Sequence, residues 1–181
     1  MTLIKSEQKI KDIIEKNGYT VETFSKKQMR EYGRKTPDFK VYKNDMLIFF
    51  CEVKCIEDFP IEMYDGKISV DKDENKVLHL INVSCNQFMS VNYNHTVPNV
   101  LAIYCERLGS DINDFKFAFE AKVTCGSGNV YHRRLTDEHT RIESKKNNID
   151  LCLWYDEIFD NYRTMYLKES KFKDIVKELI K

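Results

Sequence analysis

Long apolar segments are missing from this sequence. Its longest uncharged apolar run, MLIFFC at 46–51, has six residues, far fewer than the ~20 that a membrane-spanning helix needs. The N-terminal run MTLIKSEQKIKDIIEK carries charges throughout, which is not typical of a secretory signal. The six cysteines form no CxxC pair and lie mostly in apolar segments, as reduced core thiols do. These absences predict a cytoplasmic protein without a membrane segment.

Glycine, proline and net charge are also scarce. Only 6 glycines and 3 prolines occur, 42% of residues are hydrophobic and no repeat is visible, which excludes disordered, collagen-like and low-complexity classes. A chain of this size buries roughly 70% of its unfolded surface on folding, so we expect one domain over residues 1–181. The formal net charge of +0 argues against a general binder of polyanions.

The charges that are present are segregated along the chain. Residues 26–35, KKQMREYGRK, contain five basic residues and one acidic residue, a net charge of 5 − 1 = +4. Residues 56–75 contain seven acids and two lysines, a net charge of 2 − 7 = −5. Either run alone is typical of a solvated loop. The basic run leads directly into Pro37-Asp38, and this position makes a functional role worth considering beside that of a solvated loop.

Periodicity predicts an α/β protein with a central mixed β-sheet flanked by helices. Asn17-Gly18 is a helix stop signal, and Ser170 is a candidate N-cap for a last helix with Phe172, Ile175, Val176 and Leu179 on one face. The helices are predicted at 4–17, 76–91 and from 170 onward; the strands are predicted at 19–24, 38–43, 46–55, 99–106, 115–123, 149–155 and 162–167; and loops are predicted at 26–35 and 56–75.

The apolar strand at 46–55 carries two charges. Alternate residues of a strand share a face, so Glu52 and Lys54 point the same way as Ile48 and Phe50. Both faces of the strand are therefore partly apolar, which favours a central position. A buried charge needs a partner. Glu52 and Lys54 could pair with each other, but a carboxylate from the neighbouring strand, Asp38, would make a better site.

The turn between the two strands decides whether Asp38 can reach Glu52. The two residues lie opposite each other only if paired residue numbers sum to 90, which needs an odd loop of three or more residues, or an equivalent bulge. A two-residue Asn44-Asp45 turn would instead pair position 38 with 51 and send the acids to opposite faces. Since Asn-Asp lacks the glycine that two-residue turns prefer, we predict the longer loop.

Two carboxylates and an ammonium at one end of a sheet suit a hard divalent cation. Mg²⁺ prefers oxygen ligands and is often held by one or two carboxylates together with waters and substrate phosphates. The predicted ligands are Asp38 and Glu52, and Lys54 is placed to orient an attacking water or to offset charge developing on phosphorus.

This pattern resembles a known superfamily. Pro37-Asp38, then thirteen residues, then Glu52-Val53-Lys54 is similar to the PD-(D/E)XK nucleases, which have the restriction-endonuclease-like fold. The run SEQKIKDIIEKNGYTVE also resembles the opening helix and strand of archaeal Holliday-junction resolvases. The resemblance covers residues 4–55 and the following helix. It implies an Mg²⁺- or Mn²⁺-dependent hydrolase of branched or duplex DNA. The sequence does not give the oligomeric state, but a homodimer would be consistent with cutting both strands, which usually takes two active sites.

The resemblance also implicates residues outside the strand pair. In these relatives a glutamate of the first helix completes the metal site, and the matching position is Glu7, which shares a helix face with Ile10 and Ile14. A first-turn glutamate favoured by the helix dipole is the alternative reading. Some relatives place a glutamine on the next helix near the active site, and Gln87 is the candidate. We predict phosphate contacts from Lys26, Lys27, Arg30, Arg34 and Lys35.

Two features depart from the family pattern, and two other functions stay open. The gap between Glu7 and Asp38 is longer than in the short resolvases, and the acidic run at 56–75 is poorly suited to lying against DNA. The same fold could be a catalytically inactive module that binds nucleic acid or protein. The charges could also be a plain buried ion pair in an unrelated α/β domain. An ion pair predicts Lys54 in contact with one acid and no open oxygen, whereas a nuclease needs room for an ion.

Overall fold

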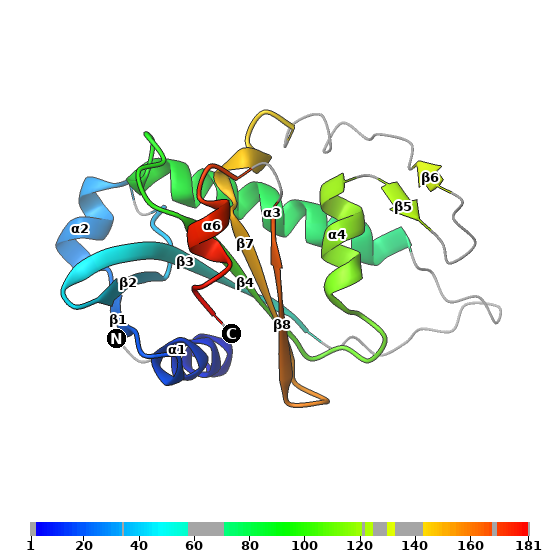
Figure 1. Ribbon diagram of the computed structural model, residues 1–181, viewed down its shortest axis with the longest axis horizontal. Coiled ribbons are helices and arrows are strands. Elements are labelled where there is room, and N and C mark those ends of the chain that lie inside the picture. Colours follow the sequence, from blue (N-terminus) through cyan, green and yellow to red (C-terminus); the bar gives the residue numbers. More distant parts are fainter. Residues whose placement is uncertain are drawn as a thin grey trace.

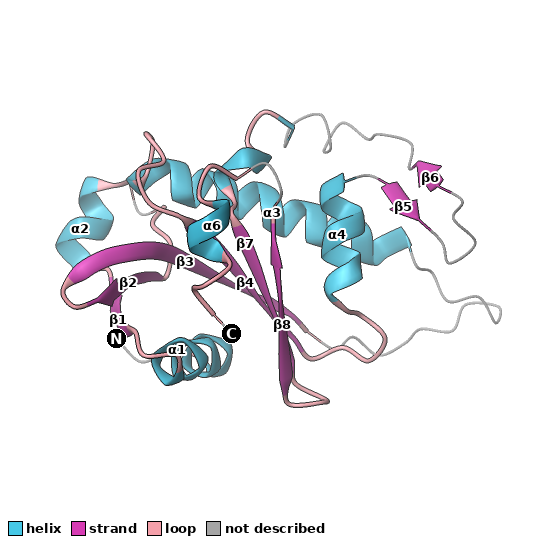
Figure 2. Cartoon of the chain, viewed as in Figure 1, coloured by secondary structure: helices cyan, strands magenta, loops and turns pink. Residues whose placement is uncertain are grey.

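The computed structural model describes residues 3–33, 35–57, 71–120, 122–124, 130–132, 143–167 and 170–180, with the backbone alone described for 71–75, 122–124 and 130–132. Figures 1 and 2 show helices flanking a central sheet. The strands are β1 (Thr20–Thr23), β2 (Phe39–Lys43), β3 (Met46–Ile56), β4 (Asn99–Cys105), β5 (Lys122–Thr124), β6 (Val130–His132), β7 (Leu151–Asp156) and β8 (Asn161–Tyr166). The helices are α1 (Lys5–Lys16), α2 (Lys26–Glu31), α3 (Asp71–Val91), α4 (Ile112–Glu120), the 3₁₀ turn η1 (Lys146–Asn148) and α6 (Lys173–Val176).

The main sheet is mixed. It has six strands in the order β1-β2-β3-β4-β7-β8. The central strands β3, β4 and β7 run parallel. Strands β2 and β8 pair antiparallel with β3 and β7, and β1 pairs antiparallel with β2. The short strands β5 and β6 form a separate antiparallel pair. The predicted α/β class with a mixed sheet flanked by helices is confirmed, and β3 is an inner strand as its two apolar faces indicated.

Each face of the sheet has its own hydrophobic core. The α1 residues Ile10 and Ile14 pack against one face, together with the C-terminal residues after α6. On the opposite face, α3 and α4 cover the strands with side chains that include Phe88 and Phe115. Figure 1 shows α1 below the strands and α3 above them. Glu52 and Lys54 follow Phe50, which packs in the α3-side core, so their side chains belong to the α3 face.

The β2–β3 hairpin brings position 38 opposite position 52, but its turn is shorter than the sequence predicted. The turn has two residues, Asn44 and Asp45, with φ of 51° and 61°, so the predicted longer loop is wrong. A bulge then corrects the register, because Tyr42 pairs with Leu47 whereas Val41 pairs with Phe49. From there the paired numbers sum to 90, as in Phe39 with Cys51, and the next pair in line is 38 with 52.

The basic run 26–35 was predicted to be a loop, but its first part is the helix α2. Ser25 Oγ accepts a hydrogen bond from Gln28 N at 3.3 Å, and Gln28 Oε1 accepts one from Ser25 N at 3.0 Å. This reciprocal capping box satisfies two backbone donors at the start of the helix. The Ser-x-x-Gln signal was present in the sequence and outweighed the loop-like charge run.

The strand predicted at 115–123 is also wrong, because residues 112–120 form the helix α4. The alternating phenylalanines of FKFAFE suggested a strand, yet Phe115 and Ala118 are buried at helical spacing. Asn113 N donates to Asp111 Oδ1 at 2.7 Å, and Asp111 N donates to Asp114 Oδ2 at 3.0 Å, which caps the helix start. The neighbouring helix α3 supplies the apolar surface, and this tertiary packing overrides the local pattern.

Three further predictions need qualification. The helix predicted from residue 76 begins at Asp71, and the final helix is only Lys173–Val176, with Ile175 half exposed rather than on the buried face. Residues 58–70 of the predicted acidic loop lie outside the described residues. Among the described helices, none combines the length and the apolar character that crossing a bilayer requires.

Candidate functional site

Four of the predicted side chains meet on the α3 face of the sheet. Asp38 immediately precedes β2, Glu52 and Lys54 lie in β3, and Gln87 projects from α3. Hydrogen bonds and electrostatic effects join these groups, although they come from three elements separated along the chain. The hairpin register and the packing of α3 on β3 place them together.

Asp38 is fixed by the backbone of the neighbouring strand. Its Oδ2 accepts a hydrogen bond from Val53 N at 2.8 Å. Burial raises the pKa of Asp38 above its usual value, while the Val53 amide and the charge of Lys54 act in the opposite direction. The carboxylate is therefore held in a defined orientation at the point where β2 meets β3.

Glu52 occupies the most buried position of the site, with 1% of the residue exposed. Burial is the main cause that raises the pKa of Glu52 from 4.5 to about 8, and the charge of Asp38 adds to it. The Lys54 ammonium and Gln87 lower the pKa but do not compensate. Burial beside Asp38 therefore favours the protonated form of the Glu52 carboxyl group, and an additional cation would favour the ionised form.

Lys54 and Gln87 connect the strand to α3 and to the segment that precedes Asp38. Lys54 Nζ donates to Glu52 Oε1 and, at 3.0 Å, to Gln87 Oε1. Gln87 Nε2 donates to the Thr36 carbonyl oxygen, also at 3.0 Å. One turn further along α3, Ser90 Oγ donates to the Lys35 carbonyl oxygen at 2.7 Å. Gln87 thus orients the ammonium group while α3 holds the chain leading into Asp38.

The two oxygens of Glu52 have different surroundings. Oε1 accepts from Lys54, which is the contact that the ion-pair interpretation predicts. Oε2 is buried and accepts no hydrogen bond from a donor in the part of the chain that the structure describes. When the Glu52 carboxyl is protonated it can hydrogen-bond Asp38, and this contact lowers the pKa of Asp38. A buried acceptor without a donor is costly. A cation bound at Oε2 would compensate for the missing donor, as the nuclease interpretation predicts. The ion-pair interpretation and the nuclease interpretation therefore each find one expected feature at Glu52.

Glu7 lies at the edge of this group. Its Oε2 accepts a hydrogen bond from Ile4 N at 3.1 Å in the first turn of α1, as the helix-start interpretation expects. The charge of Glu7 also raises the pKa of Asp38, so the two carboxylates sense each other. Over the described residues, no three Asp, Glu, His or Cys side chains are grouped closely enough to hold a metal ion. The predicted contribution of Glu7 to a metal shell stays a prediction.

The described basic residues of the run 26–35 are exposed, and Lys35 is joined to the helix that carries Gln87. Lys26, Lys27 and Arg30 are exposed on α2, which has no buried residue. Lys35 is exposed, and its backbone is tied to α3 next to Gln87. Arg34 lies outside the described residues. The basic helix and the residues that lead from it to Asp38 therefore form one continuous stretch of chain.

Sequence reasoning missed two parts of this arrangement. The backbone carbonyls of Lys35 and Thr36 anchor the segment before Asp38, and Ser90 provides one of the anchors. The spacing of Gln87 and Ser90, three residues apart on one helix, was the available signal, because such residues share a helix face.

Comparison with known proteins identifies no relative of this chain. No family model, curated protein or solved structure matches the chain.

Proposed function

We propose that this protein is a metal-dependent nuclease that hydrolyses phosphodiester bonds in DNA with a site of the PD-(D/E)XK type on a restriction-endonuclease-like fold. The observation that carries the proposal is the convergence of Asp38, Glu52 and Lys54 with one buried, unpartnered carboxylate oxygen. A structural ion pair alone would not require two neighbouring carboxylates to share one ammonium group.

The residues present fit Mg²⁺ or Mn²⁺. Asp38 and Glu52 would hold the ion, which is the number of carboxylates that Mg²⁺ commonly takes when phosphate oxygens and waters complete its shell. Glu7 is proposed as an additional carboxylate. When bound, the ion would supply Lewis-acid polarisation of the scissile phosphate. A divalent charge near Oε2 would also favour the ionised form of Glu52, whose pKa burial raises to about 8.

Lys54 is the proposed catalytic cation. Its ammonium group is part-buried, with 19% of the side chain exposed, and Gln87 fixes its position from the adjacent helix. Hydrolysis needs a water aligned with phosphorus and stabilisation of the negative charge that develops there. Lys54 can donate a hydrogen bond to either group while Gln87 keeps it oriented.

DNA is proposed to approach from the α2 side of the site. Lys26, Lys27, Arg30, Arg34 and Lys35 would contact phosphates and set the position of the strand without reading its sequence. The chain then continues from Lys35 to Asp38, so phosphate contacts and metal ligands lie on adjoining residues.

One rival function has an observation in its favour. The direct contact between Lys54 and Glu52 is what a catalytically inactive module, which binds nucleic acid or protein on the same fold, would use to hold its strands together. Such a module would bind DNA and cleave none of it.

The deciding experiment is cleavage of plasmid and branched DNA with Mg²⁺ or Mn²⁺. We expect wild-type protein to cut, and we expect Asp38→Ala and Lys54→Ala each to reduce the rate by about 100-fold or more, because each removes a group that stabilises transition-state charge. Titration of Mn²⁺ gives a second readout, since Asp38→Ala should weaken metal binding whether or not the protein cleaves.

The control is Asp174→Ala, which removes a carboxylate with 96% side-chain exposure on α6 and should leave cleavage unchanged. Cleavage that persists in both site variants would refute the proposed site. DNA binding without cleavage in the wild type would favour the inactive module.

A further inference from the structure

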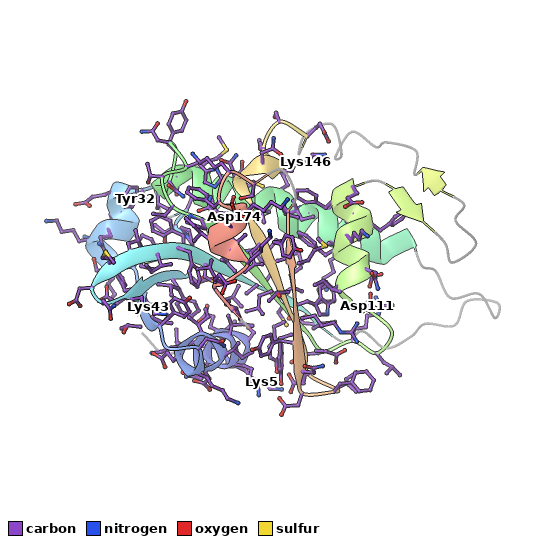
Figure 3. The ribbon with its side chains drawn as sticks, viewed as in Figure 1. Lys5, Tyr32, Lys43, Asp111, Lys146 and Asp174 are labelled. Atoms are coloured by element: carbon purple, nitrogen blue, oxygen red, sulfur yellow. The ribbon has the colours of Figure 1, made fainter. Side chains whose placement is uncertain are left out.

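A second concave site lies on the same sheet face, between β7, β8 and the start of α4. This cavity of about 460 Å³ is bounded below by the sheet and on one side by the loop that enters α4. Figure 3 labels Asp111 at the start of α4, where that loop ends. Its volume falls within the range of small-molecule sites in proteins, roughly 300–1,000 Å³. None of the residues that line it belongs to the proposed nuclease site.

The floor of the cavity is made by two cross-strand pairs. Trp154 of β7 pairs with Arg163 of β8, and Asp156 pairs with Asn161. Directly paired residues project from the same face with Cβ atoms about 5 Å apart, so the indole and the guanidinium rise together. Phe159, in the β7–β8 turn, also lines the cavity, and 70% of it is exposed. The site therefore has one buried and one exposed aromatic ring.

The two side chains of the first pair differ in what they can offer a ligand. Trp154 is 2% exposed, and its indole Nε1 is buried without a partner among the described residues. This N–H has no accessible surface, so the indole contributes apolar surface to the cavity floor and not a hydrogen-bond donor. Arg163 forms no ion pair with the described residues. Arg163 lines the cavity with an exposed guanidinium, so a ligand with carbonyl or ring-nitrogen acceptors would satisfy its donors.

Acceptors are present as well. Asp156 Oδ1 accepts from Ile158 N at 3.0 Å and from Phe159 N at 3.3 Å, whereas its Oδ2 has no partner within the described chain. Asp111 carries a second carboxylate at the cavity wall. A simple anion would be repelled by these acids, and a simple cation would be repelled by Arg163. The lining selects a neutral, planar group that has both donors and acceptors on its edge.

We propose that this cavity binds a nucleobase. The ring would stack on Phe159, its carbonyl or ring-nitrogen acceptors would face Arg163, and its exocyclic amine would face Asp156. Stacking on aromatic side chains together with hydrogen bonds to the base edge is how unpaired bases are held. The identification of the base as part of a DNA strand rests on the proposed nuclease function; the chemistry of the cavity does not.

The cavity suits a base that is several nucleotides from the cleaved bond. Lys54, Ile103 and Trp154 are consecutive partners across three strands, so Trp154 lies two strand spacings from Lys54. At about 4.8 Å per spacing this is roughly 10 Å. Ile103, which lies between them, is fully buried in the α3-side core, so a strand would have to pass around the helix. At about 3.4 Å per nucleotide, the two sites are therefore more than about three nucleotides apart along a strand. An unpaired base near a junction or bulge would be within reach while its strand passes the nuclease site.

The test uses Trp154, which is the chain's single tryptophan and so reports on the cavity directly. Full-length protein is titrated, without divalent ions, with nucleoside monophosphates and with ribose 5-phosphate, which lacks the base. We expect saturable quenching of tryptophan fluorescence by the nucleotides only. Arg163→Ala should weaken nucleotide affinity about tenfold or more, and Phe159→Ala should weaken it several-fold. Both side chains are exposed, so neither substitution should unfold the chain.

The control variant is Lys116→Ala, which removes an exposed charge from α4 outside the cavity and should bind nucleotides like the wild type. Competition between a fully paired duplex and a duplex with one unpaired base distinguishes a strand-borne base from a free nucleotide. Absence of saturable quenching, equal quenching by ribose 5-phosphate, or unchanged binding in both variants would overturn the proposal. Because binding is measured without metal or cleavage, an inactive protein that binds nucleotides refutes only the nuclease assignment.

Discussion

At the scale of single residues, the carboxyl group of Glu52 has the most unusual surroundings in the described chain. It is buried beside Asp38, and its one cationic neighbour, Lys54, is shared with Gln87. Burying a carboxylate under these conditions favours its protonated form. A divalent ion at Oε2 would reverse this preference, so protonation and metal binding should compete at one oxygen.

This competition predicts how stability depends on pH. The folded state keeps a proton on Glu52 up to about pH 8, whereas the unfolded chain loses it near 4.5. The stabilisation is fully present below pH 4.5 and is lost as pH rises through 8. Asp38, whose pKa is also raised, acts in the same direction. We expect the unfolding free energy to fall over this window, by up to about 1.4 kcal/mol per pH unit for one group.

Urea unfolding of wild type and Glu52→Gln between pH 5 and pH 8 measures this effect. The amide does not titrate, so the decline should be shallower in the variant, and other titrating groups cancel in the comparison. Mg²⁺ should restore wild-type stability at pH 8 and leave Glu52→Gln less affected. Parallel pH profiles for the two proteins would show that Glu52 titrates normally.

At the scale of elements, the basic residues of helix α2 do not take part in packing the helix against the rest of the protein. The helix buries none of its residues, and Lys26, Lys27 and Arg30 are exposed. Replacing all three with alanine should weaken DNA binding without loss of stability. Each lost phosphate contact makes the plot of log affinity against log salt shallower by about 0.9, so the triple variant should lose up to ~2.7 of slope.

A matched control removes three exposed lysines from other elements, Lys116, Lys171 and Lys173. It changes net charge equally, so it should keep most of the salt dependence if α2 makes the contacts. Equal losses in both triple variants would indicate a general charge effect instead of a binding helix.

At the scale of the whole molecule, Asp150 joins three distant segments. Its Oδ2 accepts from Asn99 N at 2.8 Å and lies 2.7 Å from His95 Nε2, and its Oδ1 accepts from Ser170 Oγ. The residue is fully buried at the start of β7. It therefore links the loop after α3, the first residue of β4 and the chain that leads into α6.

Removing this link should destabilise the entire fold. Asp150→Ala leaves the buried Asn99 amide unpaired, and we expect the unfolding free energy to fall by about 3 kcal/mol. Urea denaturation provides the measurement. Asp174→Ala, which removes an exposed carboxylate, should change stability by less than about 0.5 kcal/mol. A similar small change for Asp150→Ala would mean that the network contributes little.

The register of the β2–β3 hairpin could be predicted only in part from the sequence. The requirement that positions 38 and 52 face each other could be stated from strand periodicity alone. The way in which the hairpin meets this requirement could not be predicted, because the two-residue turn and the bulge have opposite effects on the strand register and only their sum decides which residues pair. The misassigned segment around Phe115 is similar: its alternation is local, whereas the apolar surface of α3 that makes it a helix is not.

The first helix, the inner position of β3 and the shared face of Glu52 and Lys54 followed from the amino-acid sequence alone, because they depend on local periodicity. The pairing of Trp154 with Arg163, the approach of Gln87 to Lys54 and the burial of Glu52 Oε2 were decided only by the tertiary structure. These features depend on which distant surfaces pack together, and that choice minimises the free energy of the whole chain instead of any one segment.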